Sequence, residues 1–217
     1  MTDLKLYGNN RFPYCQMVKV VAYEKEVDIV VEIVDMSKGA HKEETFLQKQ
    51  PFGQVPYLDD NGFILFQARA IGRYIALKYA NQGTNLLPNA ADIKAVALFE
   101  QAINTEQAEF DPHAGGIVTQ KTFMPRMGKK TDEEQLKRHV EVLNAKLDAF
   151  EKILSKQEYL SGNEIGLADL FTLPYGTMLE EAFPGFLQDP ARPKVTAWWT
   201  KFSNRPSWKR VMIEAEA

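Results

Sequence analysis

The stretch from Gln50 to Leu58, QPFGQVPYL, contains residue types that could hold a peptide by its backbone. Pro56 cannot donate a ladder hydrogen bond, yet it stands directly before a strand-like segment. We therefore expect the Val55–Pro56 bond to be cis, which would turn the N–H and C=O of Val55 outward, unpaired by their own sheet. Such groups can hold an extended ligand as an added strand, so the stretch predicts a site for a small peptide.

The elements that must position this stretch are indicated by the spacing of apolar residues. Strand-like segments at Leu4 to Gly8 and Asp28 to Asp35 flank a helical pattern over Gln16 to Lys25, which makes one βαβ unit. The β-branched run within Asp28 to Asp35 is typical of a buried strand in a parallel sheet. The pattern then predicts a short helix at Thr45 to Lys49, a hairpin turning at Asn61-Gly62 and a helix from Gln67 to about Ala80.

The remainder of the chain is helical in period. Turn residues at 81–85 interrupt the earlier pattern, so a linker is expected at 82–89. Gly166 stands where a helix should begin, and Asp169 can reach back to its exposed backbone donors. Helices are expected at Ala90 to about Gln120, Asp132 to Leu154, Leu167 to Phe183, Pro193 to Ser203 and Trp208 to Glu214.

Several motifs resemble those of one enzyme family. PFGQVP, the turn DDNG at 59–62 and the helix start ARAIGRYI at 68–75 resemble the glutathione-binding half of a glutathione transferase. GAHK at 39–42, FDP at 110–112 and GLADL at 166–170 are similar to the phi class, of plant or fungal type. The resemblance implies an α/β thioredoxin-like domain at 1–81, the linker, and an all-α domain at 90–217 that holds a hydrophobic co-substrate.

The resemblance also implies an activity and partners. The expected reaction adds the glutathione thiolate to hydrophobic electrophiles, as in detoxification, with glutathione as co-substrate and with no bound cofactor and no metal. The expected assembly is a homodimer. The alternative is a protein without catalysis that has the same fold and acts as a ligandin-type carrier of apolar ligands or as an interaction module.

Composition excludes some other partners. Lys and Arg number 26 against 29 Asp and Glu, which gives a net charge of −3 and no basic field for nucleic acid or anionic lipid. With 45% hydrophobic residues the chain can bury a sizeable core. No signal-peptide core and no apolar run of about 20 residues is present, and the single Cys15 cannot form an internal disulfide, so a cytoplasmic setting is expected.

Glutathione presents two carboxylates, an ammonium, two peptide units and a thiol. By the match to the family motif, Lys42 and His41 would hold the glycine carboxylate with help from Gln54, although a lone Lys is usually a solvated surface charge and a lone His more often structural. Val55, followed by Pro56, would pair its backbone with the cysteinyl unit.

The γ-glutamyl end departs from the family pattern. Gln67 and Ala68 stand where the family has a glutamate and a serine. The helix N-terminus still offers backbone N–H groups and partial positive charge to a carboxylate. Losing the hydroxyl should cost on the order of 1–3 kcal/mol, because hydrogen bonds to charged groups are strong. Arg69 could compensate in part, although an Arg at a helix start more often faces solvent.

The larger departure is Phe12, which falls where phi-class members have the serine that donates to the glutathione thiolate. Phenylalanine cannot donate, and an unperturbed thiol with a pKa of about 8.5 is only slightly ionised at neutral pH. Catalysis is therefore expected to be weakened or served by another donor. The candidates are the Asn10 side chain, the Tyr14 hydroxyl and a backbone N–H at the helix start.

The FPYC segment at 12–15 also resembles the Cys-Pro-Tyr-Cys motif of glutaredoxins, with Phe12 in place of the first cysteine. The first cysteine is the one that attacks a disulfide. Cys15 is therefore interpreted as a small apolar residue of the first helical turn rather than a redox group, which disfavours the cysteine-type transferase classes.

The second substrate is expected between the domains, in contact with aromatic and aliphatic side chains. Such residues at helical spacing are equally typical of a core. The candidates are Phe12, His113, Ile117, Thr119, Phe123 and Tyr175.

Overall fold

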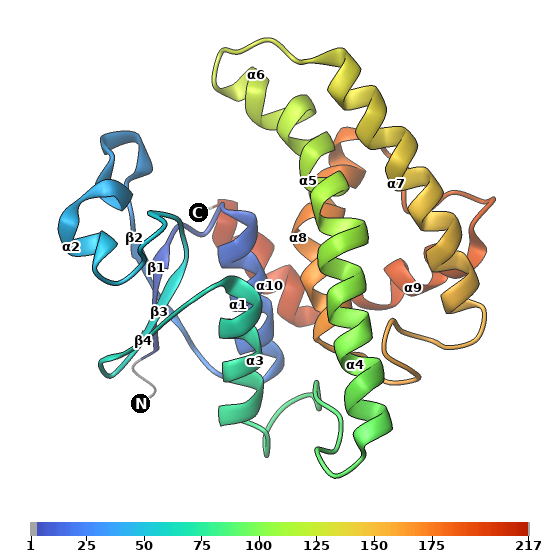
Figure 1. Cartoon of the computed structure of the whole chain (residues 1–217), viewed down its shortest axis with the longest axis horizontal. Coiled ribbons are helices and arrows are strands. Elements are labelled where there is room, and N and C mark those ends of the chain that lie inside the picture. The colour runs from blue at the N-terminus through green and yellow to red at the C-terminus, as the bar shows by residue number, and fades with distance from the viewer. Residues whose placement is uncertain (1–3, 217) are drawn as a thin grey trace. The chain divides into compact units, whose positions relative to one another are not determined.

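The computed structural model describes residues 4–216, which form two compact units (Figure 1). One unit contains the described residues up to Leu87 together with those from Pro206 onward. The other spans Pro88–Arg205. The last helix, α10 (Pro206–Glu216), therefore belongs with the first unit, whereas the sequence pattern placed it in the helical half. The physical reason is that α10 packs against α1 (Pro13–Glu24).

The first unit is built on a four-stranded mixed sheet with the order β2-β1-β3-β4. β1 (Leu4–Gly8) pairs in parallel with β2 (Val30–Ile33), and it pairs in antiparallel fashion with β3 (Tyr57–Asp60). β4 (Phe63–Phe66) completes the hairpin with β3. The predicted thioredoxin-like arrangement of a βαβ unit followed by a hairpin is confirmed.

The expectation that the strand after α1 is buried is wrong. β2 lies at the edge of the sheet, where Val30 is 54% exposed and Ile33 is 62% exposed. A run of β-branched residues is compatible with an edge as well as with a centre, because strand propensity depends on context more than on burial alone.

The helices of the first unit are α1, the short α2 (Glu44–Leu47) and α3 (Ala68–Lys78). Pro13 fits the first turn of α1, where its missing N–H has no intrahelical partner to lose. Met17, Val20 and Val21 are completely buried on α1, which packs against α3 as well as α10. Two turns of 3-10 helix, Met36–Lys38 and Ala40–Lys42, connect β2 to α2.

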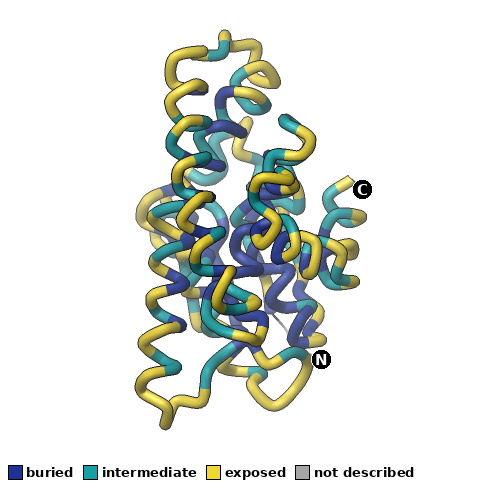
Figure 2. The backbone as a smooth tube through the Cα atoms, turned by 90° about the vertical axis from the view of Figure 1, so that its right-hand side faces the viewer, coloured by how far each residue is buried: buried dark blue, intermediate teal, exposed yellow. Residues whose placement is uncertain are grey.

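The second unit is all-helical. Its first helical run begins with α4 (Ile93–Thr105) and continues through π-helical segments at Glu106–Phe110 and Thr119–Phe123, which flank α5 (Asp111–Val118), to α6 (Met124–Arg126). α7 (Glu133–Leu154), α8 (Leu167–Ala182) and α9 (Pro193–Ser203) follow. Buried and exposed positions alternate along the helices, as amphipathic helices require (Figure 2). No helix in the described range 4–216 is long and apolar enough to cross a membrane.

The predicted cap of α8 is confirmed. Asp169 Oδ2 accepts a hydrogen bond of 2.9 Å from the backbone N–H of Gly166. Its Oδ1 accepts from the Leu160 N–H at 2.9 Å and from Trp198 Nε1 at 2.7 Å, so one carboxylate joins α8, the loop before it and α9. Complete burial raises the pKa of Asp169 to about 6, against the lowering effect of these donors.

Candidate active site

The register of the sheet brings three site segments to one edge. Tyr7 is paired with Tyr57, and Tyr57 with Phe66, so the residues after β1, before β3 and after β4 are neighbours. The end of β1 lies close to the segment before β3, because a Cβ placed at Gly8 would lie 3.7 Å from the Cβ of Pro56. Adjacent strands are about 4.8 Å apart, so the three segments span roughly 10 Å.

Val55 is the middle segment. The Val55–Pro56 bond is cis, as the sequence predicted. Within residues 4–216, neither the N–H nor the C=O of half-buried Val55 has a hydrogen-bond partner. Backbone groups that are removed from water are almost always paired, so the unpaired donor and acceptor of Val55 need a partner. An extended ligand lying along Val55 can supply it.

The third segment is the start of α3. Gln67 has φ 73°, a left-handed conformation that non-glycine residues rarely adopt, and it precedes the buried Ala68 and the half-buried Arg69. Gln67 is itself exposed. Both α1 and α3 begin at this edge because they follow β1 and β4, so two helix N-termini contribute partial positive charge there.

Lys42 approaches the loop that leads to Val55. Its Nζ donates to the carbonyl oxygens of Gly53 at 3.0 Å and Phe52 at 3.4 Å, which places the ammonium beside the exposed Gln54. Gly53 has φ 57°, and a Cβ there would come within 2.7 Å of Lys42 Nζ, so this approach requires glycine. His41 Nδ1 is buried and has no hydrogen-bond partner among the described residues.

Phe12 is the N-cap of α1, with extended backbone angles and no side-chain cap. Its carbonyl oxygen accepts from the N–H groups of Cys15 at 2.9 Å and Gln16 at 3.0 Å. Asn10 lies in the same loop, and its Oδ1 accepts from Lys19 Nζ at 2.6 Å. Tyr14, the other side chain predicted as a donor, is half-buried in the first turn of α1.

Cys15 is completely buried beneath this edge. Burial raises the pKa of its thiol to about 12, although the Asn9 N–H at 3.4 Å from Sγ and the charge of Lys19 act in the opposite direction. The thiol therefore stays protonated at neutral pH, which supports its interpretation as a small apolar residue.

Apart from Phe12 at the start of α1, the residues predicted to contact a hydrophobic substrate lie on α5, the π-helical segment after it and α8. His113 faces α7, where its Nδ1 lies 3.4 Å from Nδ1 of His139. Ile117 has no exposed surface, and the ring of Tyr175 packs on the backbone at Gly115. Thr119 and Phe123 are both half-buried in the π-helical segment, as is Thr122.

Comparison with known proteins decides the family. The model "Glutathione S-transferase, N-terminal domain" matches residues 2–77, and "Glutathione S-transferase, C-terminal domain" matches residues 114–206. The chain belongs to the glutathione S-transferase family. A relative from Arabidopsis thaliana, glutathione S-transferase PM239X14, is 44% identical over 92% of this chain and 91% of its own.

Further relatives indicate the phi class for this transferase. Glutathione S-transferase 3 of Zea mays is 39% identical over 98% of this chain and 94% of its own. The crystal structure of glutathione transferase F7 from Populus trichocarpa superposes with a TM-score of 0.91 at 35% identity, covering 98% of this chain and 99% of that one. The chain therefore belongs to a family of enzymes. The predicted fold, a thioredoxin-like domain followed by a helical domain, and the predicted co-substrate, glutathione, are confirmed.

The sequence reasoning gave no role to two charged residues, Lys19 and Glu214, that are linked to the loop at 9–12. Lys19 is completely buried on α1, and Glu214 on α10 lies 2.6 Å from its Nζ. A lysine within the apolar run from Met17 to Val21 was the available signal, because a buried ammonium requires a partner.

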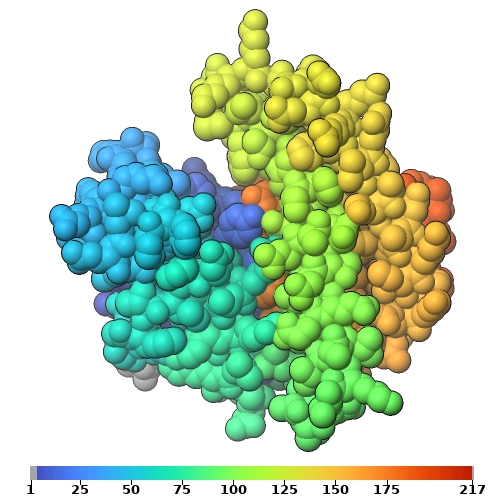
Figure 3. All heavy atoms as spheres, viewed as in Figure 1, coloured from blue at the N-terminus to red at the C-terminus, as the bar shows by residue number. Residues whose placement is uncertain are grey.

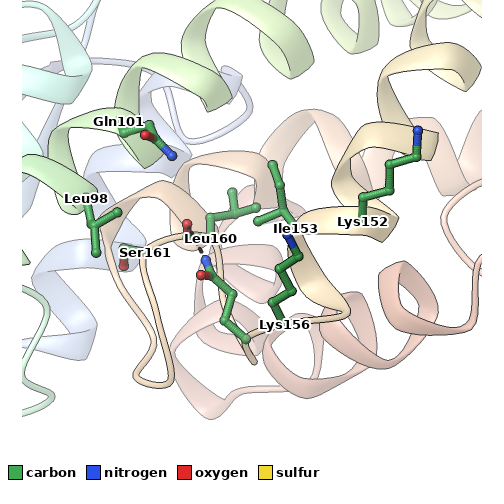
Figure 4. Close-up of a pocket in the computed structure, with 8 residues that line it drawn as sticks. Leu98, Gln101, Lys152, Ile153, Lys156, Leu160 and Ser161 are labelled. Carbon is green, nitrogen blue, oxygen red and sulfur yellow. Dashed lines mark hydrogen bonds between the residues drawn. The ribbon is translucent and has the colours of Figure 1, made fainter.

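A separate hollow lies in the helical unit of the transferase, where α4 and the end of α7 lie side by side on one face (Figure 3). None of the predicted site residues lines it. Gln157 Nε2 donates to the Leu160 carbonyl oxygen at 2.9 Å. The close-up shows the side chains of Leu98 and Gln101 from α4 and of Lys152 and Ile153 from α7 (Figure 4). Its lining comprises Leu98, Gln101, Lys152, Ile153, Lys156, Gln157, Leu160 and Ser161.

Proposed function

We propose that this transferase conjugates glutathione to hydrophobic electrophiles, with glutathione lying along Val55 as an added strand. The observation that carries this proposal is the unpaired N–H and C=O of Val55 at the sheet edge. The cysteinyl unit of glutathione supplies the complementary donor and acceptor. Maize glutathione S-transferase I, 29% identical with a TM-score of 0.89, has been solved with an atrazine glutathione conjugate, which supports the same type of product.

The two ends of glutathione then meet complementary groups. The glycine carboxylate extends toward Lys42, His41 and Gln54, where Lys42 supplies the positive charge. The γ-glutamyl end extends to the start of α3, where Gln67, Ala68 and Arg69 meet the helix N-terminus. The sulfur lies toward the loop at 9–12, because that loop follows β1, the strand next to β3.

Asn10 is the side chain that we assign as donor to the sulfur. An ammonium can only donate, so the bond from Lys19 fixes the Oδ1 of Asn10 toward Lys19 and leaves the Nδ2 hydrogens for another acceptor. A hydrogen bond to a thiolate favours its ionised form and lowers its pKa. The thiol proton leaves to solvent, the thiolate attacks the electrophilic carbon, and with a chlorinated aromatic acceptor chloride departs with the bonding electron pair.

The half-buried side chains that we propose for the acceptor are Thr119 and Phe123 in the helical unit and, separately, Phe12 in the first unit. Ile117 would have to move before it could make such a contact, since it has no exposed surface. His113 packs against His139, and Tyr175 packs against Gly115, both within the helical unit. We therefore do not assign these two side chains a contact with the acceptor.

The test combines glutathione calorimetry with a rate assay on a chlorinated aromatic acceptor, with and without glutathione. Lys42→Ala should weaken glutathione binding by about tenfold, because a charge-assisted hydrogen bond to a carboxylate is lost. Lys38→Ala is the matched control, because Lys38 is exposed and pairs with Asp35. Absence of glutathione binding in the unaltered protein would refute the proposal.

A second candidate function is the carriage of apolar ligands without catalysis. It is favoured by Phe12 and Ala68, which remove two hydroxyls that catalysis uses and folding does not. Binding of an apolar dye, combined with glutathione binding and no conjugation at any pH, would support this function instead.

A further inference from the structure

The last turn of α10 lies against the loop that leads into α1. Trp208 and Val211 are buried on α10, which fixes this helix to the first unit. Beyond them, Arg11 Nε donates to the carbonyl oxygen of Ala215 at 3.1 Å. The loop is thus joined to α10 by a side chain that lies directly before Phe12.

A second connection runs through Lys19. Its side chain is only 1% exposed, and its Nζ lies 2.6 Å from Glu214 Oε2 and 2.6 Å from Asn10 Oδ1. Asn10 is also held through its backbone, because its carbonyl oxygen accepts from Gln16 Nε2 at 3.1 Å. One buried ammonium therefore joins the carboxylate of α10 to the amide of the loop.

Glu214 is itself held in place. Its Oε2 accepts from the Tyr23 hydroxyl at 2.6 Å, and its Oε1 accepts from Arg210 Nε at 3.0 Å. Partial burial would raise the pKa of Glu214, but the bonds from Lys19, Tyr23 and Arg210 outweigh this effect and lower it. Glu214 is therefore ionised at neutral pH, as a partner for Lys19 must be.

We propose that α10 positions the loop at 9–12 for the thiol step, with Glu214 as a positioning residue that acts through Lys19 on the amide of Asn10. The inference rests on the proposed function, because it names the residues that hold the loop of the proposed glutathione site in place. Glu214 touches no reacting atom. It holds Lys19, Lys19 holds Oδ1 of Asn10, and the Nδ2 hydrogens of Asn10 are thereby directed to the remaining acceptor, the glutathione sulfur.

The experiment compares Glu214→Ala with Glu216→Ala in the full chain. Both substitutions remove a glutamate from the last turn of α10, but Glu216 is exposed. Glu214→Ala should speed amide hydrogen exchange at residues 9–12 and lower kcat by about tenfold, with KM for glutathione little changed, because misplacement of a donor costs rate more than binding. The rate should recover toward high pH, where the thiol ionises without help. Glu216→Ala should match the unaltered protein.

Two further variants keep the result decisive. Glu214→Gln restores an acceptor for Lys19 and should recover part of the rate. If Glu214→Ala does not fold, the double variant Lys19→Met/Glu214→Leu replaces the ion pair with apolar side chains, which a buried site tolerates, and it still releases Asn10. Its exchange at residues 9–12 should rise in the same way.

Unchanged exchange at residues 9–12, or an equal change in Glu216→Ala, would overturn the inference. So would a loss of kcat that is the same at every pH. Failure of the proposed function has a different signature, because the unaltered protein would then not conjugate glutathione, whereas exchange is measured without substrate and still decides whether α10 holds the loop.

Discussion

At the residue scale, Phe12 is the N-cap of α1, and its side chain provides neither a helix cap nor a hydroxyl donor. A serine there could accept a hydrogen bond from the first turn of α1 while donating its own hydrogen to the glutathione sulfur, because a hydroxyl does both. Phe12 does neither with its side chain. The helix is nevertheless started by Pro13 and by the Phe12 carbonyl, so α1 forms although the Phe12 side chain offers no donor.

Phe12→Ser is expected to raise the conjugation rate near neutral pH by about tenfold or more, because a donor to the sulfur lowers the pKa of the thiol. At about pH 9, above the unperturbed thiol pKa, the gain should vanish. The measurement is kcat/KM across pH. A gain that is equal at all pH values would mean that removal of the ring only enlarged the apolar site, and no gain at any pH would remove Phe12 from the catalytic position.

Ala68→Ser is expected to tighten glutathione binding by about tenfold, which corresponds to about 1.4 kcal/mol from one restored hydrogen bond to the γ-glutamyl carboxylate. Ala68 is 7% exposed at the first position of α3, where a hydroxyl would meet that carboxylate. Calorimetry gives the affinity, and Ala70→Ser, on an exposed position of the same helix, is the control. Equal affinity in both variants would assign the carboxylate to another group, with Arg69 as the first candidate.

At the element scale, single polar side chains join helices that lie far apart in sequence. Asp169 receives donors from the start of α8, from the preceding loop and from Trp198 on α9. His113 and His139 connect α5 and α7 through facing ring nitrogens. The stability of the helical unit depends on these contacts because each one satisfies polar groups that packing removes from water.

Asp169→Ala should destabilise the protein by about 3 kcal/mol or more, because it leaves three buried donors without an acceptor at about 1–3 kcal/mol each. Urea denaturation measures the change. Asp132→Ala is the contrast, since Asp132 caps α7 at an exposed position and should cost only about 1 kcal/mol. Similar losses in the two variants would contradict the central role of Asp169.

His113 should make the protein less stable in mild acid. Burial lowers its pKa, and the charges of His139, Lys146 and Arg138 lower it further against the opposing effect of Glu109. The unfolded chain therefore takes up this proton first as pH falls through about 6.5, so stability decreases there and levels off once the folded form is also protonated.

The thermal midpoint should accordingly fall less between about pH 7.5 and about pH 5.5 in His113→Gln than in the unaltered protein. His41→Gln, which alters the histidine outside the pair, is the control. A drop in His113→Gln as large as in the unaltered protein would show that other groups cause the acid sensitivity.

At the scale of the whole molecule, an exposed aromatic ring indicates how two copies could associate. Phe52 is 62% exposed, and its ring meets Phe66 edge-on at 6.0 Å, which leaves most of its surface uncovered within its own chain. We expect a homodimer at micromolar concentration by light scattering. Phe52→Ala should weaken it by about tenfold or more, as aromatic anchors do, whereas Ile213→Ala on the outer face of α10 should not. A monomeric unaltered protein would contradict this assembly.

The sequence by itself determined the local features of this protein. The cis bond before Pro56, the hairpin at Asn61-Gly62 and the Asp169 cap were predictable because each depends on residues within a few positions of one another. The order of strands and helices followed from periodicity, and the family followed from motifs of the same short range.

Only the tertiary structure decided which segments meet. Sequence pattern placed β2 in the sheet interior and α10 in the helical half, and it left Lys19 without a role, because propensity describes a segment and not its neighbours. Tyr23 and Glu214 are 191 positions apart and still share a hydrogen bond of 2.6 Å. The physical reason is that a buried charge is stabilised by whichever partner the folded chain brings to it, and that partner is chosen by packing over the whole unit.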